Sequence, residues 1–385
     1  MKTVTILGAT GSIGTSTLDL IEREPERFRV VALTANCDVE RLATAAIRTR
    51  AAFAAVADAS CLPALREALA GTGIAAGGGP EAVCEAARMP VDWTMGAIVG
   101  CAGLSPIMAA IEQGSTVVLA NKEPLVSAGD VILAAAARSG ATLLPADSEH
   151  NAIFQCFDFA RPERIRRVIL TASGGPFRDF TRDQMAQVTP EQAVAHPNWS
   201  MGAKISVDSA TLMNKGLELI EAARLFPVAQ EQIEIVLHRQ SVIHSMVEYV
   251  DGSMLAQLGP SDMRVPIAHT LAWPDRMATP MPPLDLVAVG RLDFEAPDAD
   301  RFPALRLTRA ALIAGGAKPA ILNAANEIAV AAFLDRRIGF LEIAAIVEDT
   351  LAGYDPEDPL TLEAVLGVDA EARRVAREQV KDCVH

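Results

Sequence analysis

Short apolar runs and amphipathic segments alternate along the first 146 residues. The apolar runs predict buried strands at residues 3–7, 29–34, 52–57, 97–99, 116–120 and 142–144. Between them, apolar residues recur at every third or fourth position, which predicts helices over residues 15–23, 39–48, 60–69, 104–113 and 128–138. Alternating strands and helices are typical of a parallel sheet with helices on both faces. We therefore predict an α/β fold whose N-terminal domain, residues 1–146, contains a Rossmann-like parallel sheet.

The pattern changes after residue 146. An apolar run at 168–171 predicts a strand that ends at a Ser-Gly-Gly-Pro sequence, and residues 209–226 are predicted to form a helix. Two further strands, 245–250 and 253–258, flank Asp251-Gly252, which is a strong hairpin signal. The polar stretch that begins at His196 is too irregular for a core element, and we interpret it as a flexible lid. These features predict a central α+β catalytic domain over residues 147–273.

The last third of the chain begins with a proline-rich segment. Six prolines fall within residues 274–303, a density that predicts an extended linker. Beyond the linker, helical spacing of apolar residues predicts four helices at residues 305–315, 319–334, 341–351 and 360–380. We therefore expect a C-terminal helical bundle over residues 304–385.

Composition and charge exclude several classes of protein. The formal net charge of -14 argues against nucleic-acid binding, because the surface repels phosphate backbones. No apolar run approaches the roughly 20 residues of a membrane span, and the first residues lack the long apolar region of a signal peptide. The six cysteines include no C-x-x-C pair, so we expect reduced thiols and a cytoplasmic protein.

The first predicted strand runs directly into a glycine-rich loop, Gly8-Ala9-Thr10-Gly11-Ser12-Ile13-Gly14. Glycines let the backbone approach a pyrophosphate, whose charge then lies at a helix N-terminus. An ordinary strand-to-helix turn is the alternative, since the spacing is not the usual G-x-G-x-x-G. The position of the loop at the start of a βαβ array favours a dinucleotide-binding domain.

The second predicted strand is followed by Asn36-Cys37-Asp38, where such a domain contacts the adenosine ribose. An acidic residue there favours a free 2′-hydroxyl, and a basic residue favours a 2′-phosphate. Asp38 and Arg41 are both present, so the choice between NADH and NADPH stays open at this point.

Two carboxylates, Asp147 and Glu149, lie two residues apart just after a predicted strand. In an extended segment they point to the same side and repel each other unless a cation neutralises them. Oxygen ligands suit Mg²⁺ or Mn²⁺. The alternative, about equally well supported, is an N-cap with acidic residues in the first turn of a helix that starts near Asn151.

A third carboxylate, Glu218, lies on the predicted helix 209–226. Asp208 or Ser209 would cap that helix, and Asn214 and Lys215 share a face with Glu218. An amide, an ammonium and a carboxylate on one face suit a phosphate beside a metal. The alternative is a solvated salt bridge, although Gly216 inside the helix suggests that something approaches closely.

Four further residues are weaker candidates. Ser173 and the glycines after it resemble an anion nest, but a plain turn is as good an interpretation. Lys122 follows a strand at the ligand-binding edge of the sheet, where it would polarise a substrate oxygen or remain a surface lysine. We favour a lid position for His196 and a core position for His244.

Taken together, these motifs resemble the 1-deoxy-D-xylulose 5-phosphate reductoisomerase family. The segments that carry the resemblance are residues 8–14, 119–123, 147–151, 172–177, 196–202, 208–218, 271–274 and 323–327. They span nearly the whole chain.

The resemblance implies a function and a role for each motif. A family member rearranges 1-deoxy-D-xylulose 5-phosphate, by retro-aldol cleavage and re-addition, and reduces it with NADPH to 2-C-methyl-D-erythritol 4-phosphate. The implied metal ligands, for Mg²⁺ or Mn²⁺, are Asp147, Glu149 and Glu218, which with Lys122 and His196 are the catalytic set. The implied phosphate ligands are Ser173, Ser209, Asn214 and Lys215. Ser148 and Lys122 would contact the carbon chain of the substrate, a small phosphosugar.

The resemblance also implies a lid, a cofactor site and an oligomer. The lid would contain His196, Trp199 and Met201, with Gly202 near the nicotinamide. The implied cofactor contacts are Thr10, Gly11, Ser12, Ile13, Gly14, Asn36, Asn121 and Glu123. The family further implies a homodimer, with no nucleic-acid or membrane partner.

The chain departs from the family pattern at three positions. Cys37 stands where a basic residue is frequent, Pro124 where serine is common, and Ser261 where proline is frequent. Three other functions compete with the family's reaction: a metal-free dehydrogenase, a non-catalytic dinucleotide-binding sensor, and a metal-dependent aldolase that uses no hydride. Only the family's reaction uses the glycine loop, Lys122, the three carboxylates and the phosphate-binding helix together.

Overall fold

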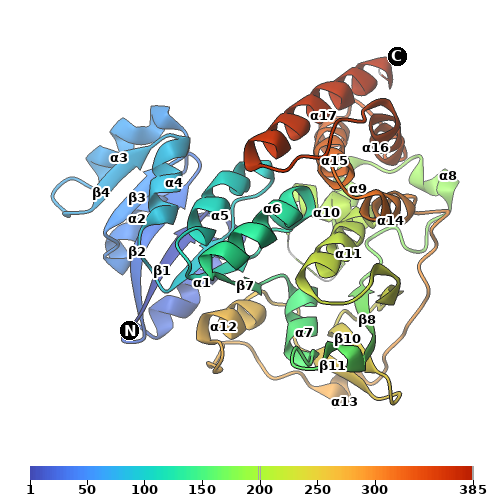
Figure 1. Cartoon of the computed structure of the whole chain (residues 1–385), viewed down its shortest axis with the longest axis horizontal. Coiled ribbons are helices and arrows are strands. Elements are labelled where there is room, and N and C mark those ends of the chain that lie inside the picture. The colour runs from blue at the N-terminus through green and yellow to red at the C-terminus, as the bar shows by residue number, and fades with distance from the viewer. Residues whose placement is uncertain (198, 200, 384–385) are drawn as a thin grey trace. The chain divides into compact units, whose positions relative to one another are not determined.

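The computed structural model describes residues 1–197, 199 and 201–383 (Figure 1). Asn198 and Ser200 of the expected lid lie outside the described residues. The chain folds into two compact units. Unit 1 comprises Met1–Pro124, Ile132–Asn151 and Asp262–Met281, and unit 2 comprises Leu125–Val131, Ala152–Ser261 and Pro282–His385. The finer division into four parts at residues 146, 273 and 303 stays a prediction.

Unit 1 is built on a seven-stranded parallel sheet, as the alternating pattern predicted. Its strand order is β4-β3-β2-β1-β5-β6-β7. The strands are β1 (Lys2–Leu7), β2 (Phe28–Ala35), β3 (Phe53–Val56), β4 (Ala75–Gly78), β5 (Trp93–Gly96), β6 (Thr116–Leu119) and β7 (Thr142–Pro145). The connecting helices are α1 (Ser12–Arg23), α2 (Val39–Thr49), η1 (Ala59–Cys61), α3 (Leu62–Ala68), α4 (Pro80–Arg88), η2 (Cys101–Gly103), α5 (Leu104–Ile111) and α6 (Glu123–Ser139).

Two parts of this sheet differ from the prediction. The strand expected at 97–99 is β5, Trp93–Gly96, and Val99 is 66% exposed in the loop that follows it. β5 pairs with β1 and β6, and a Cβ on Gly96 would lie 2.1 Å from Ile107 Cδ1, so glycine makes room for α5. The edge strand β4 was not predicted, because its sequence Ala-Ala-Gly-Gly carries no strand signal.

Unit 2 contains a four-stranded mixed sheet in the order β11-β10-β8-β9. Its strands are β8 (Ile165–Ala172), β9 (Ile233–Leu237), β10 (Ile243–Tyr249) and β11 (Met254–Leu258). The predicted hairpin at Asp251-Gly252 is confirmed, with β10 antiparallel to β11, whereas β9 was not predicted and runs parallel to β8. The other elements of the central region are α7 (Ser148–Cys156), η3 (Pro162–Arg164), α8 (Arg182–Met185), α9 (Pro190–Val194), α10 (Ala203–Ala210), α11 (Met213–Leu225) and η4 (Gln230–Gln232).

The helix predicted over 209–226 is wrong in one respect, because two helices replace it. Leu212 has a left-handed backbone with φ of 60° and separates α10 from α11. The Leu212 side chain is buried, so core packing holds a conformation that leucine disfavours. Asp208 and Ser209 therefore lie in the last turn of α10 and do not cap a helix.

The C-terminal helices are confirmed with small shifts in their ends. They are α14 (Ala304–Ala314), α15 (Lys318–Leu334), α16 (Glu342–Gly353) and α17 (Leu362–Cys383). The proline-rich segment before them is largely extended, with one short helix, α13 (Leu286–Val289). No helix among the described residues combines the length and the apolar character needed to cross a bilayer.

The motif at 323–327 has a packing role. The buried Asn326 amide donates to Asp208 Oδ1 at 2.8 Å, which joins α15 to α10. Glu327 accepts a hydrogen bond from Arg373 of α17 at 2.6 Å, and Arg373 also contacts Asp369. This polar network fixes α10, whose last turn carries Ser209.

Candidate active site

The glycine-rich loop of unit 1 is tightly constrained. Gly8 has φ of +90°, and a Cβ there would lie 2.6 Å from the carbonyl oxygen of Ala97. A Cβ on Gly14 would lie 2.3 Å from the carbonyl oxygen of Gly8. α1 starts at Ser12 with Gly11 as its N-cap and no side-chain cap, so its first N–H groups are available to an anion. The loop fits a dinucleotide pyrophosphate, with Thr10 in the turn and Ser12 and Ile13 at the start of α1.

The Gly14→Ala variant tests this loop. The added methyl group must displace loop backbone, so we expect the dissociation constant for NADPH to rise about 100-fold, roughly 2.7 kcal/mol. Titration of cofactor fluorescence measures it. Gly367→Ala on an exposed face of α17 is the matched control, because a Cβ there meets nothing within 4 Å. Unchanged NADPH affinity in Gly14→Ala would show that the cofactor does not use this loop.

At the end of β2, Asp38 is the N-cap of α2. Its Oδ1 atom accepts a hydrogen bond from the Arg41 N–H at 3.1 Å, and its Oδ2 atom lies 3.5 Å from Arg41 Nη1. Asn36 and Cys37 beside it are exposed. The helix N-terminus and Arg41 therefore partly balance the charge of Asp38.

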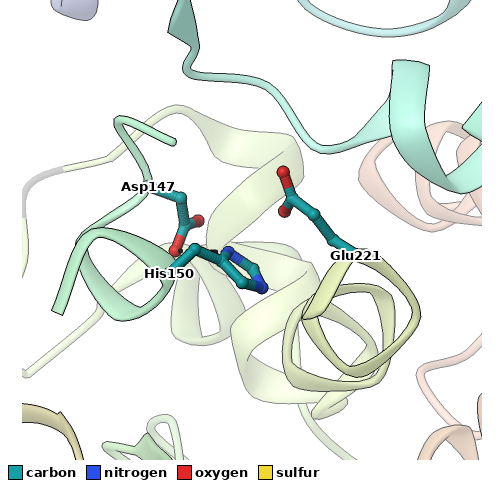
Figure 2. Close-up of side chains that lie close together, drawn as sticks. All are labelled: Asp147, His150 and Glu221. Atoms are coloured by element: carbon teal, nitrogen blue, oxygen red, sulfur yellow. Dashed lines mark ion pairs between the residues drawn. The ribbon is translucent and has the colours of Figure 1, made fainter. Parts of the chain in front are cut away.

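Lys122 and Asp147 form a buried ion pair in unit 1. Lys122 Nζ lies 2.8 Å from Asp147 Oδ2, and the two residues are 6% and 8% exposed. Lys122 is thus not a surface lysine. On the other side of the carboxylate, His150 Nδ1 lies 3.3 Å from Asp147 Oδ1 (Figure 2). Burial by itself raises the pKa of Asp147, but the charge of Lys122 and the hydrogen bond from His150 outweigh it and hold this pKa well below its ordinary value.

The first turn of α7 combines both interpretations of the carboxylate pair. α7 starts at Ser148, earlier than expected, and Asp147 Oδ1 accepts a hydrogen bond from the Glu149 N–H at 3.1 Å. The Ser148 hydroxyl donates to the half-buried carboxylate of Glu149. Asp147 therefore caps α7, and two carboxylates with oxygen donors stand at the carboxyl end of β7. Such a donor set fits Mg²⁺ or Mn²⁺.

Two residues after β6 are suited to a ligand at the same edge of the sheet. The Asn121 Nδ2 atom is buried and has no hydrogen-bond partner among the residues that the structure describes. Glu123, the first residue of α6, is 5% exposed. A buried amide donor that lacks a partner is costly, so a bound cofactor that accepts from Asn121 would remove that cost.

In unit 2, the turn after β8 lies against the end of α10. Gly174 and Gly175 both have positive φ, and a Cβ on Gly175 would lie 2.6 Å from the carbonyl oxygen of Ser209. The Gly175 N–H faces Ser173 Oγ at 3.3 Å. Consecutive residues of this kind turn backbone N–H groups inward, so the turn, which also carries the Ser173 hydroxyl, suits an anion.

The polar face of α11 is buried. Lys215 and Glu218 are 3% and 0% exposed and form an ion pair, and Asn214 Nδ2 lies 2.6 Å from Glu218 Oε1. The solvated salt bridge is therefore wrong as an interpretation. A Cβ on Gly216 would lie 2.3 Å from Thr308 Oγ1, so α14 and not a ligand accounts for this glycine.

The described part of the expected lid contacts the turn after β8, which contains Ser173, Gly174 and Gly175. His196 Nδ1 accepts a hydrogen bond from the Trp199 N–H at 3.0 Å, so the proton of a neutral ring lies on Nε2. That atom is 2.9 Å from Ser173 Oγ. The indole of Trp199 donates to Ser241, which the sequence did not single out and which has a positive φ.

Three further candidate residues of unit 2 are Met201, Gly202 and His244. Met201 is half-buried, and Gly202 is the N-cap of α10. His244 is 6% exposed, which agrees with a core position, and its ring centroid lies 6.0 Å from that of Trp199. Unit 1 therefore carries the glycine-rich loop, Lys122, Asp147, Ser148 and Glu149. Unit 2 carries the expected lid, the turn after β8 and the polar face of α11, on which Glu221 is also buried.

Comparisons with known proteins agree over most of the chain. The model of 1-deoxy-D-xylulose 5-phosphate reductoisomerase matches residues 4–129, and models of two C-terminal domains of this enzyme match residues 143–226 and 258–375. A reductoisomerase from Zymomonas mobilis is 62% identical over 372 residues, which cover 97% of this chain and 96% of the relative.

Two solved structures resemble this chain closely. The enzyme from Zymomonas mobilis in complex with NADPH has a TM-score of 0.95 and 59% identity, and covers 99% of both chains. A reductoisomerase in complex with NADPH, fosmidomycin and magnesium also has a TM-score of 0.95, with 45% identity over 99% of this chain and 98% of that chain.

Proposed function

The chain belongs to the 1-deoxy-D-xylulose 5-phosphate reductoisomerase family, and we propose that the residues described above perform the reaction of that family. The enzyme rearranges 1-deoxy-D-xylulose 5-phosphate and reduces it with NADPH to 2-C-methyl-D-erythritol 4-phosphate. The observation that carries this conclusion is the 62% identity to a reductoisomerase over 97% of the chain.

We assign the divalent cation to Asp147 and Glu149, and to Glu218 as the third ligand that the family resemblance implies. When bound, Mg²⁺ or Mn²⁺ supplies Lewis acidity to substrate oxygens that gain negative charge. Lys122 holds the Asp147 carboxylate ionised and in place, which supports this assignment. Ser148 and Lys122 are positioned to orient the carbon chain of the substrate.

We assign the substrate phosphate to Ser173, Ser209, Asn214 and Lys215. The buried ammonium of Lys215 supplies positive charge that the acidic surface of the protein lacks. His196, Trp199 and Met201 close over the phosphosugar and exclude water, which keeps a reactive aldehyde from hydrating. The contact between His196 and Ser173 supports this role.

We assign NADPH to the glycine-rich loop, with Asn36, Asn121, Glu123 and Gly202 as further contacts. When bound, the cofactor supplies the hydride. The N-terminus of α1, which has no side-chain cap, binds the pyrophosphate of the cofactor. The buried Asn121 amide donates a hydrogen bond to the bound cofactor.

The function is tested by the consumption of NADPH in the presence of substrate and Mn²⁺ or Mg²⁺. Oxidation that stops when the metal is chelated supports the proposal. Oxidation that a chelator does not affect would favour a metal-free dehydrogenase. Folded protein that binds NADPH but oxidises none would favour a non-catalytic dinucleotide sensor.

Asp38 sets part of the preference between NADPH and NADH. We expect Asp38→Asn to lower the KM for NADPH about threefold, because a negative charge near the 2′-phosphate is removed. Asparagine is an equally good N-cap, so α2 should be preserved. The KM for NADH, which has a free 2′-hydroxyl, is the internal comparison and should not fall. The effect should shrink at high salt, and a KM for NADPH that does not fall would contradict the assignment.

We also propose a homodimer and a cytoplasmic location. No strand among the described residues pairs with the outer edge of β11, where Met254 is 45% and Leu255 is 50% exposed. A second copy of the chain would pair with β11 at this edge. Light scattering should give twice the chain mass, and Leu255→Lys should shift it towards the monomer; an unchanged dimer would place the interface elsewhere. Cys37, Cys61 and Cys84 are free thiols, which suits a reducing compartment.

A further inference from the structure

One helix that is distant in sequence from the rest of unit 1 is joined to that unit by hydrogen bonds. α12 (Arg264–Ala272) lies within the range predicted for the central domain, residues 147–273, but it belongs to unit 1. Arg264 Nη1 donates to Asp19 of α1 at 3.0 Å. Near the other end of α12, the Trp93 indole donates to the Thr270 carbonyl at 3.1 Å and Lys2 Nζ to the Leu271 carbonyl at 2.8 Å. α12 is therefore a fixed support beside β1 and α1.

This support contacts the segment that carries the unit 1 carboxylates. Asn151 is 1% exposed, and its Nδ2 atom donates to the carbonyl oxygen of Pro145 at 2.9 Å. The same nitrogen lies 3.1 Å from Nδ1 of His269 on α12. A carbonyl oxygen only accepts, so the amide orientation is fixed, and His269 Nδ1 must accept the second amide hydrogen.

The consequence concerns Asp147 and Glu149, which lie between Pro145 and Asn151 in the sequence. The Asn151 amide closes this turn onto the end of β7 through Pro145, and His269 holds the same amide from outside the turn. An accepting Nδ1 requires a neutral imidazole, and burial of His269, with a smaller effect of Arg276, lowers its pKa to about 4. The ring therefore stays neutral at physiological pH.

We propose that His269 is a positioning residue for the metal site, which acts through Asn151 to hold the turn that carries Asp147 and Glu149. This role rests on the proposed metal site and adds a support that touches neither metal nor substrate. α12 also holds α1 through Arg264. It therefore sets the positions of both α1, which follows the glycine-rich loop, and the turn that carries Asp147 and Glu149.

Two conservative variants distinguish positioning from simple packing. His269→Asn places an amide oxygen where Nδ1 stood, so it can accept from Asn151. His269→Gln is also polar, but its acceptor lies about one bond farther out. Mn²⁺ binding is measured by electron paramagnetic resonance on the full chain without substrate, and NADPH binding by fluorescence.

We expect His269→Gln to weaken Mn²⁺ binding about 10- to 100-fold, the usual cost of losing such a support, and His269→Asn to stay within about threefold of the wild type. NADPH binding should be unchanged in both. Equal Mn²⁺ affinity in all three proteins would overturn this role alone. Equal losses in both variants, together with weaker NADPH binding, would show that the histidine only packs. A wild-type chain that binds no Mn²⁺ would overturn the metal site itself.

Discussion

Asp147→Asn is expected to lower kcat/KM by about 10³-fold or more. The change removes a charged metal ligand, and Lewis-acid stabilisation contributes several kcal/mol to a transition state; about 4 kcal/mol corresponds to about 10³-fold. It also leaves the ammonium of Lys122 buried beside a neutral amide, where the wild type has an ion pair with 2.8 Å between Nζ and Oδ2. Activity assays over a range of Mn²⁺ concentrations measure the effect.

A matched control separates the ligand from the general effect of losing a carboxylate. Asp183→Asn makes the same chemical change on the exposed first turn of α8 and should keep wild-type activity. NADPH affinity should be unchanged in Asp147→Asn, because the cofactor loop is intact. Wild-type kcat/KM and Mn²⁺ affinity in Asp147→Asn would rule Asp147 out as a metal ligand.

Lys215→Met is expected to lower kcat/KM for the phosphorylated substrate by about 10³-fold. Removing one partner of a buried, hydrogen-bonded charge pair costs about 2–5 kcal/mol, and a dianionic phosphate loses its buried cation here. Methionine keeps most of the volume of lysine, which limits the packing defect. Most of the loss should be in KM, since the phosphate is bound in the ground state as well as in the transition state.

Two comparisons check the Lys215 result. Lys381→Met, on the exposed last turn of α17, should have no effect on activity. Mn²⁺ should still bind Lys215→Met, because Glu218 keeps its carboxylate and loses a competing ammonium. An unchanged KM would mean that the phosphate lies away from α11.

The sequence predicted the fold wherever one residue pattern dominated. The strand before the glycine-rich loop and the four C-terminal helices have clear periodicity, and all are found close to the predicted bounds. Tertiary contacts decided the rest. β5 ends at Gly96, before the apolar run at 97–99, and Gly96 leaves room for Ile107. Leu212 breaks the predicted helix although neither glycine nor proline stands at that point.

The candidate site shows the same division. Carboxylates two residues apart, and an amide, a lysine and a glutamate on one helical face, could be found from spacing. The burial of these residues could not be predicted from spacing, yet burial is what distinguishes the Lys215–Glu218 pair from a surface salt bridge. His269 was not predicted because it contacts Asn151 across 118 positions of sequence, and no local pattern marks such a contact.

This chain is expected both to rearrange and to reduce its substrate. The most direct measurement uses 1-deoxy-D-xylulose 5-phosphate labelled with ¹³C at carbons 3 and 4, incubated with enzyme, NADPH and Mn²⁺, with the product examined by NMR. Rearrangement breaks the bond between the two labels, so we predict that their one-bond coupling disappears while one NADPH is oxidised per product. A reduced product that keeps the coupling would show that the chain is a simple dehydrogenase and does not rearrange its substrate.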